Sequence, residues 1–191
     1  KVYRESYDLF AVQGWLFNHE GVRRGEEFVT RKITKKIAEI SHAIKKGDDF
    51  TPLELGNLES KRDWSDAEDF VGGVWLMLNQ SLPKDYVLSS GTCFSIKDFV
   101  NACLDCANIP GQWIGRGVEE KFIIENYLAE DLNLNTSIIA KVNEKFYRPA
   151  EVDILQGDPS LAEKELLWQR NVKFHDLVEK MYKSDLNNFC S

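Results

Sequence analysis

Two hydrophobic patterns alternate along the chain. Apolar residues fill most of 10–17, Phe-Ala-Val-Gln-Gly-Trp-Leu-Phe, and a shorter apolar run covers 86–88. Near-continuous runs of this kind are typical of strands buried on both faces of a parallel sheet. Between the two runs, apolar residues recur at close to helical spacing and predict a helix over 26–45. That stripe consists of Phe28, Ile33, Ile37, Ile40 and Ile44.

Polar signals predict where further helices begin. Ser65-Asp66-Ala67-Glu68 has the pattern of a capping box, and Asp158-Pro159 places a proline directly after an N-cap residue. Residues 49–58 have the pattern of a strand and turn, whereas 119–145 is polar and irregular and no element is predicted there. Because strands alternate with helices, the chain is expected to be α/β. The expected helices run from Ser65 to about Gln80, from Ser95 with Asp98 onward, from Asp158 to about Trp168, and over 174–183.

Composition narrows the classes of function. With 191 residues, 43% of them hydrophobic, the chain can form one compact core, or one core with a small lobe. A net charge of −7 argues against nucleic-acid binding, and no apolar run approaches the roughly 20 residues of a membrane span. The four cysteines are too sparse for a disulfide framework, so a cytoplasmic location is expected. The chain opens on Lys1 with no signal peptide, and 1–18 has the pattern of the middle of a domain, so we expect a fragment.

The first candidate site follows the first predicted strand. Asn18-His19-Glu20 stands just beyond its carboxyl end, where α/β proteins bind ligands. Guanidinium groups and a helix N-terminus together favour phosphate, so the basic cluster that follows predicts a phosphate site. The alternative is a solvated helix face. The cluster has six basic residues within 14 positions: Arg23, Arg24, Arg31, Lys32, Lys35 and Lys36.

Two further motifs carry an arginine. In Lys61-Arg62-Asp63-Trp64, Arg62 is placed to reach a phosphate or a sugar hydroxyl, and the alternative is a surface salt bridge to Asp63 or Asp66. In Phe-Tyr-Arg-Pro-Ala-Glu at 146–151, the arginine precedes a proline and is held on extended backbone. Together with the nearby glutamate, this arginine can clamp a diphosphate and ribose. The alternative is that the arginine and the glutamate form an internal ion pair.

The remaining reactive residues predict little chemistry. His19 is the one histidine in a suggestive place, and no metal-ligand spacing surrounds it. Cys103-x-x-Cys106 has no second pair, so no metal site is expected. Neither a GxSxG nor a phosphate-binding GxGxxG is present in these residues.

The motifs together resemble a known family. Asn-His-Glu-x-x-Arg-Arg-Gly-Glu-x-Phe-Val-Thr-Arg-Lys-Ile-Thr at 18–34, Leu-Gly-Asn-Leu-Glu-Ser-Lys-Arg-Asp-Trp at 55–64, Trp-Leu-Met-Leu at 75–78 and Tyr-Arg-Pro-Ala-Glu-Val-Asp-Ile-Leu-Gln-Gly-Asp-Pro at 147–159 resemble the GDP-mannose 4,6-dehydratases in order and spacing. The resemblance covers nearly the whole chain and is weakest at 119–145.

This resemblance implies the C-terminal part of an extended Rossmann-type dehydrogenase/reductase, with a partial parallel sheet and a small α/β substrate-binding lobe. Residues 1–25 and 65–90 are then expected to be a remnant of the nucleotide-binding domain, and 26–64 and 91–191 the sugar-nucleotide lobe. The implied activity is the NADP-dependent conversion of GDP-mannose to GDP-4-keto-6-deoxymannose, a precursor of GDP-fucose. Hydride leaves C4 of the mannose for NADP, water is eliminated across C5 and C6, and the hydride returns to C6.

The resemblance also implies binding residues and an assembly. His19 and Arg24 are expected to contact NADP, and pairing of subunits near the Arg-Arg loop leaves open that Arg23 serves a neighbouring subunit's cofactor. The full-length protein is expected to be a homo-oligomer, either a dimer or a tetramer. The residues implied to line the GDP-mannose site are Asn18, Val29, Lys32, Asn57, Arg62, Arg148 and Glu151.

Departures from the family pattern leave other interpretations open. The Gly-rich dinucleotide loop, the acid–base pair and the Tyr-x-x-x-Lys motif of the family all lie upstream, so no catalytic residue is expected in this chain and the isolated chain is expected to be inactive. Gly21-Val22 stands where the family often has Ser-Pro. The alternatives are a related nucleotide-sugar epimerase or reductase, and a non-catalytic nucleotide-sugar-binding or oligomerisation module.

Overall fold

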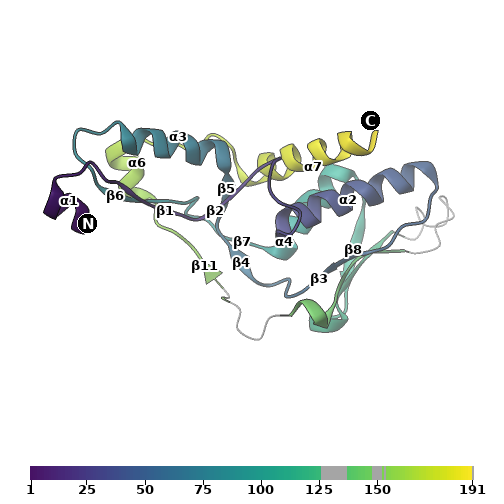
Figure 1. Cartoon of the computed structure of the whole chain (residues 1–191). Helices are drawn as coiled ribbons and strands as arrows, with labels where there is room; N and C mark the ends of the chain where they lie inside the picture. Colours follow the sequence, from purple (N-terminus) through teal and green to yellow (C-terminus); the bar gives the residue numbers. More distant parts are fainter. Residues whose placement is uncertain (126–136, 148–151, 153, 191) are drawn as a thin grey trace. The chain divides into compact units, whose positions relative to one another are not determined.

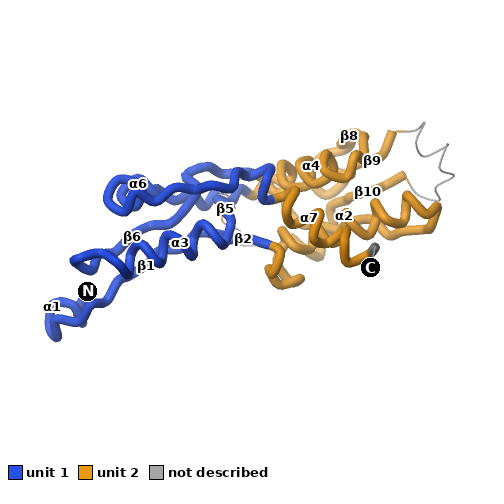
Figure 2. The backbone as a smooth tube through the Cα atoms, turned by 90° about the horizontal axis from the view of Figure 1, so that it is seen from above, with its two compact units in different colours: residues 1–21, 61–94, 154–177 blue, residues 22–60, 95–153, 178–191 orange. Residues whose placement is uncertain are grey.

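The computed structural model describes residues 1–125, 137–147, 152 and 154–190. The chain forms two compact units, each assembled from three separate stretches (Figure 2). Unit 1 contains residues 1–21, 61–94 and 154–177, and unit 2 contains residues 22–60, 95–153 and 178–191.

Unit 1 is built on a pair of parallel strands. Strand β1 (Gln13–Leu16) pairs in parallel with β6 (Asp85–Leu88), with Gly14 opposite Tyr86. This confirms that the two apolar runs of the sequence are neighbouring strands. Helices α3 (Ala67–Leu78) and α6 (Ser160–Leu166) pack against them, and the short helix α1 (Val2–Tyr7) precedes β1.

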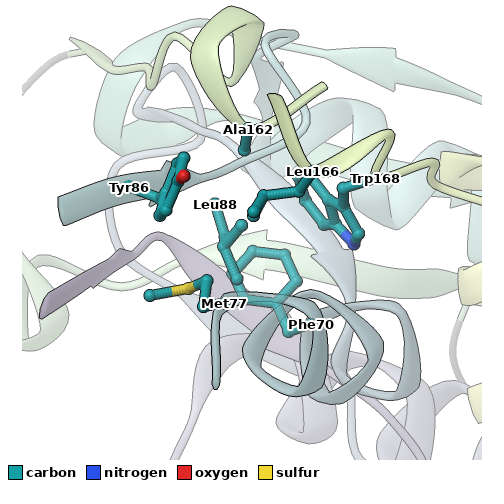
Figure 3. Close-up of a cluster of buried hydrophobic side chains, with 7 residues drawn as sticks. All are labelled: Phe70, Met77, Tyr86, Leu88, Ala162, Leu166 and Trp168. Atoms are coloured by element: carbon teal, nitrogen blue, oxygen red, sulfur yellow. The ribbon is translucent and has the colours of Figure 1, made fainter. Parts of the chain in front are cut away.

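The core of unit 1 joins residues that are distant in sequence. The side chains meet between α3, β6 and α6, and each is less than one-tenth exposed (Figure 3). The Trp168 indole N–H donates to the Asp69 carbonyl at 2.9 Å, which ties the segment after α6 to the first turn of α3. The cluster consists of Phe70, Met77, Tyr86, Leu88, Ala162, Leu166 and Trp168.

Short parallel strands bring the sequence motifs of unit 1 together. Strand β2 (Asn18–Glu20) pairs with β5 (Trp64–Asp66), and β4 (Lys61–Arg62) pairs with β11 (Ile154–Leu155). The first polar triplet therefore lies beside the Lys-Arg-Asp-Trp motif, with Asn18 opposite Trp64. The two-residue strand β7 (Phe94–Ser95) stands where the chain passes into unit 2.

Unit 2 places helices over a four-stranded mixed sheet (Figure 1). Helix α2 (Val29–Lys46) packs on α4 (Ile96–Ala107), and α7 (Phe174–Cys190) contributes its residues from Val178 onward. The predicted stripe of α2 is confirmed at Ile33, Ile37 and Ile40, which are fully buried, whereas Phe28 precedes the helix and is 42% exposed. The strand order is β3 (Leu53–Leu55), β10 (Ile138–Val142), β9 (Lys121–Ile124) and β8 (Gly111–Ile114), with one parallel pair, β3 with β10.

Part of this sheet lies where the sequence predicted no element. Strands β9 and β10, together with the 3-10 turns η1 (Gly117–Glu119) and η2 (Glu144–Phe146), occupy the described residues of 119–145. The interpretation of this segment as irregular is therefore wrong. Antiparallel pairing of Phe122 with Ala140 links stretches separated in sequence, and no local signal reports such a pair.

Two predicted helix starts differ in detail from the structure. Helix α4 begins with the expected capping box, in which Ser95 accepts from the Asp98 N–H and Asp98 accepts from the Ser95 N–H. Helix α3, however, is capped by Asp66, whose carboxylate accepts from the Glu68 N–H at 2.8 Å, and Ser65 lies in strand β5 instead. At α6 the N-cap residue is Pro159 and the first helical residue is Ser160, so the expected start with Asp158 as N-cap is one residue too early. The Asp158 carboxylate still accepts from the Ser160 N–H at 3.0 Å.

The units cut across the boundaries expected from the sequence. Residues 61–64 and 154–177 belong to unit 1, because β4 pairs with β11 and α6 packs on α3 and β6. The assignment of 1–25 and 65–90 to nucleotide binding, and of the rest to the sugar nucleotide, remains a prediction. Among the described residues, no helix is long and apolar enough to cross a membrane.

Candidate functional site

His19 is held rigidly on β2. Its Nδ1 lies 2.8 Å from the Phe17 carbonyl oxygen, and its ring stacks on Phe70 with a centroid distance of 5.2 Å and an interplanar angle of 27°. Because a carbonyl oxygen only accepts hydrogen bonds, Nδ1 is the donor in this contact. In the tautomer with its one hydrogen on Nδ1, Nε2 is an acceptor suited to a hydroxyl or amide N–H of a ligand.

Asp63 fixes the strand that carries Arg62. The Asp63 carboxylate is fully buried and accepts from three backbone N–H groups: Ser90 at 2.5 Å, Gly91 at 2.9 Å and Gly157 at 3.2 Å. Arg62 stands next to it on β4 and donates to its neighbour Lys61 at the carbonyl oxygen, 2.8 Å away. The carboxylate thus fastens two loops to the base of the Arg62 strand.

Sequence reasoning considered Asp63 only as a salt-bridge partner for Arg62. Its backbone partners lie 27, 28 and 94 positions further along the chain, which leaves no local pattern to detect. One indirect signal exists, because glycines occur at two of the three donors. At Gly157 a side chain would meet the Ser89 Cβ at 2.4 Å, so this loop requires the close approach that glycine permits.

Half of the basic cluster serves the fold of unit 2. Lys35 pairs with Glu26 at 2.6 Å at the surface, whereas the partly buried Lys36 binds Glu39 at 2.5 Å and the Thr51 hydroxyl at 2.8 Å. Arg31 is more buried and pairs with Asp185 at 2.7 Å. The solvated-face reading therefore holds for Lys35, while Lys36 and Arg31 make contacts within the fold.

Arg31 also shapes the loop of the two remaining arginines. Its Nη1 donates to the carbonyl oxygens of Val22 and, at 3.3 Å, of Arg24. The Arg24 guanidinium lies over the Phe28 ring, 3.5 Å from its centroid, while Arg23 is exposed. The internal guanidinium group holds the backbone, so the Arg23–Arg24 loop has a defined shape in which Arg23 reaches solvent.

Lys32 occupies a different environment from its basic neighbours. Its ammonium lies 3.8 Å from the centroid of the Phe146 ring, a cation–π contact. Burial lowers the pKa of Lys32, and the nearby Glu54 carboxylate partly opposes that shift. Glu54 itself binds Lys141 at 3.0 Å and the Asn143 amide at 2.8 Å. Lys32 is thus a partly desolvated cation, which is the state that strengthens attraction for an anionic ligand.

The Gly56–Asn57 turn lies next to Phe146. A side chain at Gly56 would meet the Phe146 carbonyl oxygen at 2.4 Å, so the two segments touch through backbone. The Asn57 side-chain oxygen accepts from the Glu59 N–H at 2.9 Å and fixes the turn. Lys32 and this turn therefore both adjoin Phe146, which stands two positions before Arg148 in the sequence.

The predicted site residues fall into three sets. Asn18, His19 and Arg62 belong to unit 1, on the short strands β2 and β4. Arg148 and Glu151 lie outside the described residues. The assignment of Lys32, Arg62 and Arg148 to the GDP-mannose site therefore remains a prediction. The unit 2 set is Arg23, Arg24, Val29, Lys32 and Asn57, with half-buried Val29 as the first residue of α2.

Solved structures show the fold of this chain. RMD from Pseudomonas aeruginosa, complexed with NADPH, aligns with 97% of this chain and 52% of its own at a TM-score of 0.72 and 15% identity. A UDP-glucose 4-epimerase from Thermus thermophilus, in complex with NAD, aligns with 96% of this chain and 49% of its own at a TM-score of 0.65 and 17% identity. The chain thus has the expected fold of part of an extended Rossmann-type dehydrogenase/reductase.

Sequence relatives give the family. The family model described as GDP-mannose 4,6 dehydratase matches residues 1–181, and the chain belongs to this family. A GDP-mannose 4,6 dehydratase of Drosophila melanogaster is 45% identical over 185 residues, covering 96% of this chain and 43% of that protein. One of Vibrio cholerae serotype O1 is 41% identical over 187 residues, covering 96% of this chain and 48% of that protein. The chain spans about half the length of the curated relatives it matches.

Proposed function

We propose that this chain is the sugar-nucleotide-binding part of a GDP-mannose 4,6-dehydratase, an NADP-dependent hydro-lyase that supplies GDP-4-keto-6-deoxymannose for GDP-fucose synthesis. The observation that supports it most is the family match over residues 1–181, within which all the proposed binding residues lie. The catalytic residues are assigned to the half that this chain does not contain. The isolated chain is therefore expected to bind its substrate and to leave it unchanged.

His19 and the Arg23–Arg24 loop are assigned to the nicotinamide cofactor. His19 offers a fixed acceptor nitrogen, and the Arg23–Arg24 loop is held in shape by Arg31. Arginine side chains match the ribose 2′-phosphate of NADP. NAD lacks this phosphate, so the arginines favour NADP. The cofactor supplies the redox chemistry, taking a hydride from C4 of the mannose and returning it at C6. The contribution of this chain is to bind and orient, since none of its described residues has been assigned a proton-transfer role.

Residues for the GDP-mannose diphosphate are cationic and partly desolvated. Lys32 carries its charge against Phe146 rather than in open water, and Arg62 stands on a strand braced by Asp63. Arg148 precedes a proline and completes the proposed set of cations. Hydrogen bonds to charged groups contribute about 1.5–3 kcal/mol each, so three such groups suit the diphosphate of a nucleotide sugar. Asn18, Val29, Asn57 and Glu151 are assigned to the remaining contacts with the nucleotide and sugar.

A second candidate function is a non-catalytic nucleotide-sugar-binding or oligomerisation module. The observation that favours it is that the chain spans about half of its relatives. A third candidate function is that of a related epimerase or reductase. The solved structures share the fold of this chain, but the family match favours the dehydratase. As a dehydratase, the full-length protein is proposed to be a cytoplasmic homo-oligomer.

Calorimetric titration of the chain with GDP-mannose, GDP and UDP-glucose tests the binding half of the proposal. Selective binding of the two guanine nucleotides is expected, and equal binding of UDP-glucose would contradict it. A fusion of this chain to the upstream portion of the Drosophila relative tests the activity. With NADP, that fusion is expected to form the 4-keto-6-deoxy product from GDP-mannose, while the chain alone forms none. A fusion that binds both ligands and yields an epimer or a reduced sugar would favour the third candidate.

A further inference from the structure

The Phe146 ring forms a contact between two separate elements of unit 2. Phe146 ends the turn η2 and is 47% exposed, and its ring centroid lies 3.8 Å from the Lys32 ammonium of α2. An aromatic ring exposed to this extent buries too little surface to be fixed by packing alone. The position of the ring therefore depends on its backbone and on the cation.

The backbone of Phe146 is fixed against the end of β3. The Phe146 N–H donates to the Asn143 carbonyl oxygen at 3.0 Å, and the Asn143 N–H donates to the Leu55 carbonyl oxygen at 2.8 Å. In addition, the Phe146 carbonyl oxygen lies so close to Gly56 that no side chain fits there. These contacts determine where the ring begins.

The Asn143 side chain connects η2 to Glu54. Its oxygen accepts from the Lys145 N–H at 3.0 Å, and its amide donates to Glu54 Oε2 at 2.8 Å. Lys141 binds the other carboxylate oxygen, Oε1, at 3.0 Å. Burial lowers the pKa of Lys32, and the Glu54 carboxylate is near enough to oppose that shift. The carboxylate that could attract Lys32 thus has a separate donor on each of its oxygens.

Lys32 differs in its contact from other cations of α2. Arg31 pairs with Asp185 and Lys35 pairs with Glu26, and in each pair the carboxylate offsets the positive charge. An aromatic ring is neutral and attracts an ammonium through its quadrupole, so it does not cancel the charge. The ring therefore holds the Lys32 ammonium in place and leaves its charge available for an anion.

We propose that Phe146 is a positioning residue of the GDP-mannose site, whose ring holds the Lys32 ammonium off the Glu54 carboxylate and keeps its charge available for the substrate diphosphate. This inference rests on the proposed function, in which Lys32 contacts that diphosphate. Phe146 acts through Lys32 and does not itself contact the substrate. Lys141 and Asn143 complete the arrangement, because they occupy the carboxylate that would otherwise attract the ammonium.

Nuclear magnetic resonance of this chain with isotopically labelled lysine tests the ring contact without any ligand. The ε-methylene protons of Lys32 are expected to resonate upfield of those of the exposed lysines, because ring currents shield nuclei above an aromatic face. Phe146→Leu is expected to remove that shift and Phe146→Tyr to retain it, and Lys32→Arg assigns the signal. An unchanged Lys32 signal in Phe146→Leu would show that the ring does not hold the ammonium, and would overturn the proposal.

Calorimetric titration with GDP-mannose tests the consequence for binding, in a fusion of this chain to the upstream portion of the Drosophila relative. Phe146→Leu is expected to weaken GDP-mannose binding about threefold to tenfold, and Phe146→Tyr is expected to bind as the unmodified fusion does. In a Lys32→Ala background, Phe146→Leu is expected to cause no further loss, because the ring acts only through the ammonium. Leu161→Ala, at a position of α6 that is 46% exposed, is the matched control and is expected to leave the affinity unchanged.

Circular dichroism checks that each variant is folded. Equal GDP-mannose affinity of Phe146→Leu and the unmodified fusion would overturn the positioning role. A loss of the same size in the Lys32→Ala background would mean that the ring contacts the substrate directly, which would also overturn it. If the unmodified fusion binds no GDP-mannose while the upfield Lys32 signal persists, the proposed function fails together with the assignment of Phe146 to that site. This result is distinct from a failure of Phe146 alone, in which the unmodified fusion still binds GDP-mannose.

Discussion

Arg31 of α2 and Asp185 of α7 form a buried ion pair, with 2.7 Å between Nη2 and Oδ1. The Asp185 side chain is 2% exposed, and it also accepts from the Thr34 hydroxyl at 2.7 Å. Since the same guanidinium binds the carbonyl oxygens of Val22 and Arg24, this pair connects the packing of two helices to the shape of the arginine loop.

Removing the acidic partner is expected to destabilise unit 2 strongly. Asp185→Asn leaves the Arg31 charge buried without its counter-charge, which typically costs about 3–5 kcal/mol. Urea denaturation measures this loss. The control is Lys183→Ala, which breaks the exposed Lys183–Glu179 pair on the same helix and is expected to leave the midpoint unchanged. Equal midpoints for Asp185→Asn and the unmodified chain would show that the buried pair does not stabilise the unit.

Asp63→Ala is expected to loosen two loops of unit 1 at once. The substitution removes the acceptor of three backbone N–H groups that lie in partly buried surroundings. A buried donor left unsatisfied costs about 1–3 kcal/mol, and water entering the site offsets part of the sum, so a loss of about 2–4 kcal/mol is expected. Asp63→Asn keeps one acceptor oxygen and is expected to lose less.

Amide hydrogen exchange distinguishes this local effect from general destabilisation. In Asp63→Ala, the amides of Ser90, Gly91 and Gly157 are expected to exchange faster by a larger factor than those in the interior of α4. Uniform acceleration across both units would mean that Asp63 contributes only to global stability and does not brace the Arg62 strand.

Whether a feature of the fold could be predicted from the sequence depends on how far apart in the chain its interacting residues lie. The Ser95–Asp98 capping box lies within four residues and was predicted in full. At α3 the sequence predicted a capping box beginning at Ser65. Strand β5 pairs with β2 through Asp66, so the helix begins only at Ala67 and Asp66 caps it. The β9–β10 pair and the contacts of Asp63 join distant segments, and no periodicity reports them.

The candidate site divides in the same way. Residue types that suit phosphate were recognisable in the sequence, but which of them pair within the fold was not. Arg31 and Lys32 are adjacent in sequence, and the structure gives the first an internal carboxylate and the second an aromatic ring. The distinction depends on Asp185 and Phe146, more than 100 positions away, so it required the fold.

Lys32 is expected to make folding less favourable at neutral pH. Burial lowers its pKa in the folded chain below the ordinary value of 10.5, so the unfolded chain binds more protons between those two pKa values. Stability therefore rises with pH across this window, and the penalty is fully present below the folded pKa. Lys32→Met is expected to be more stable than the unmodified chain at pH 7, and the difference is expected to shrink as pH approaches 10.5.

Denaturation of the two proteins at a series of pH values checks this linkage. Comparing the difference between them cancels the titration of groups that they share. Lys35→Met is the control, because Lys35 pairs with Glu26 at the surface of the same helix. A Lys32→Met advantage that grows with pH would contradict the assigned direction of the pKa shift.

Lys32 and Arg62 are each proposed to contact the diphosphate of GDP-mannose. In the fusion with the upstream portion of the Drosophila relative, Lys32→Ala and Arg62→Ala are each expected to weaken GDP-mannose binding about tenfold, by removal of a charge-assisted contact. Neither change is expected to alter NADP affinity. His19→Ala is expected to weaken NADP binding and leave GDP-mannose affinity unchanged, because its acceptor nitrogen is assigned to the cofactor.

The double variant Lys32→Ala/Arg62→Ala decides whether the two cations share the diphosphate. Groups that bind the same phosphates are coupled, so the combined loss in affinity is expected to differ from the product of the single losses by about threefold or more. Independent sites would give the simple product. Unchanged GDP-mannose affinity in both single variants would remove these residues from the site, while selective loss of NADP binding would reassign them to the cofactor.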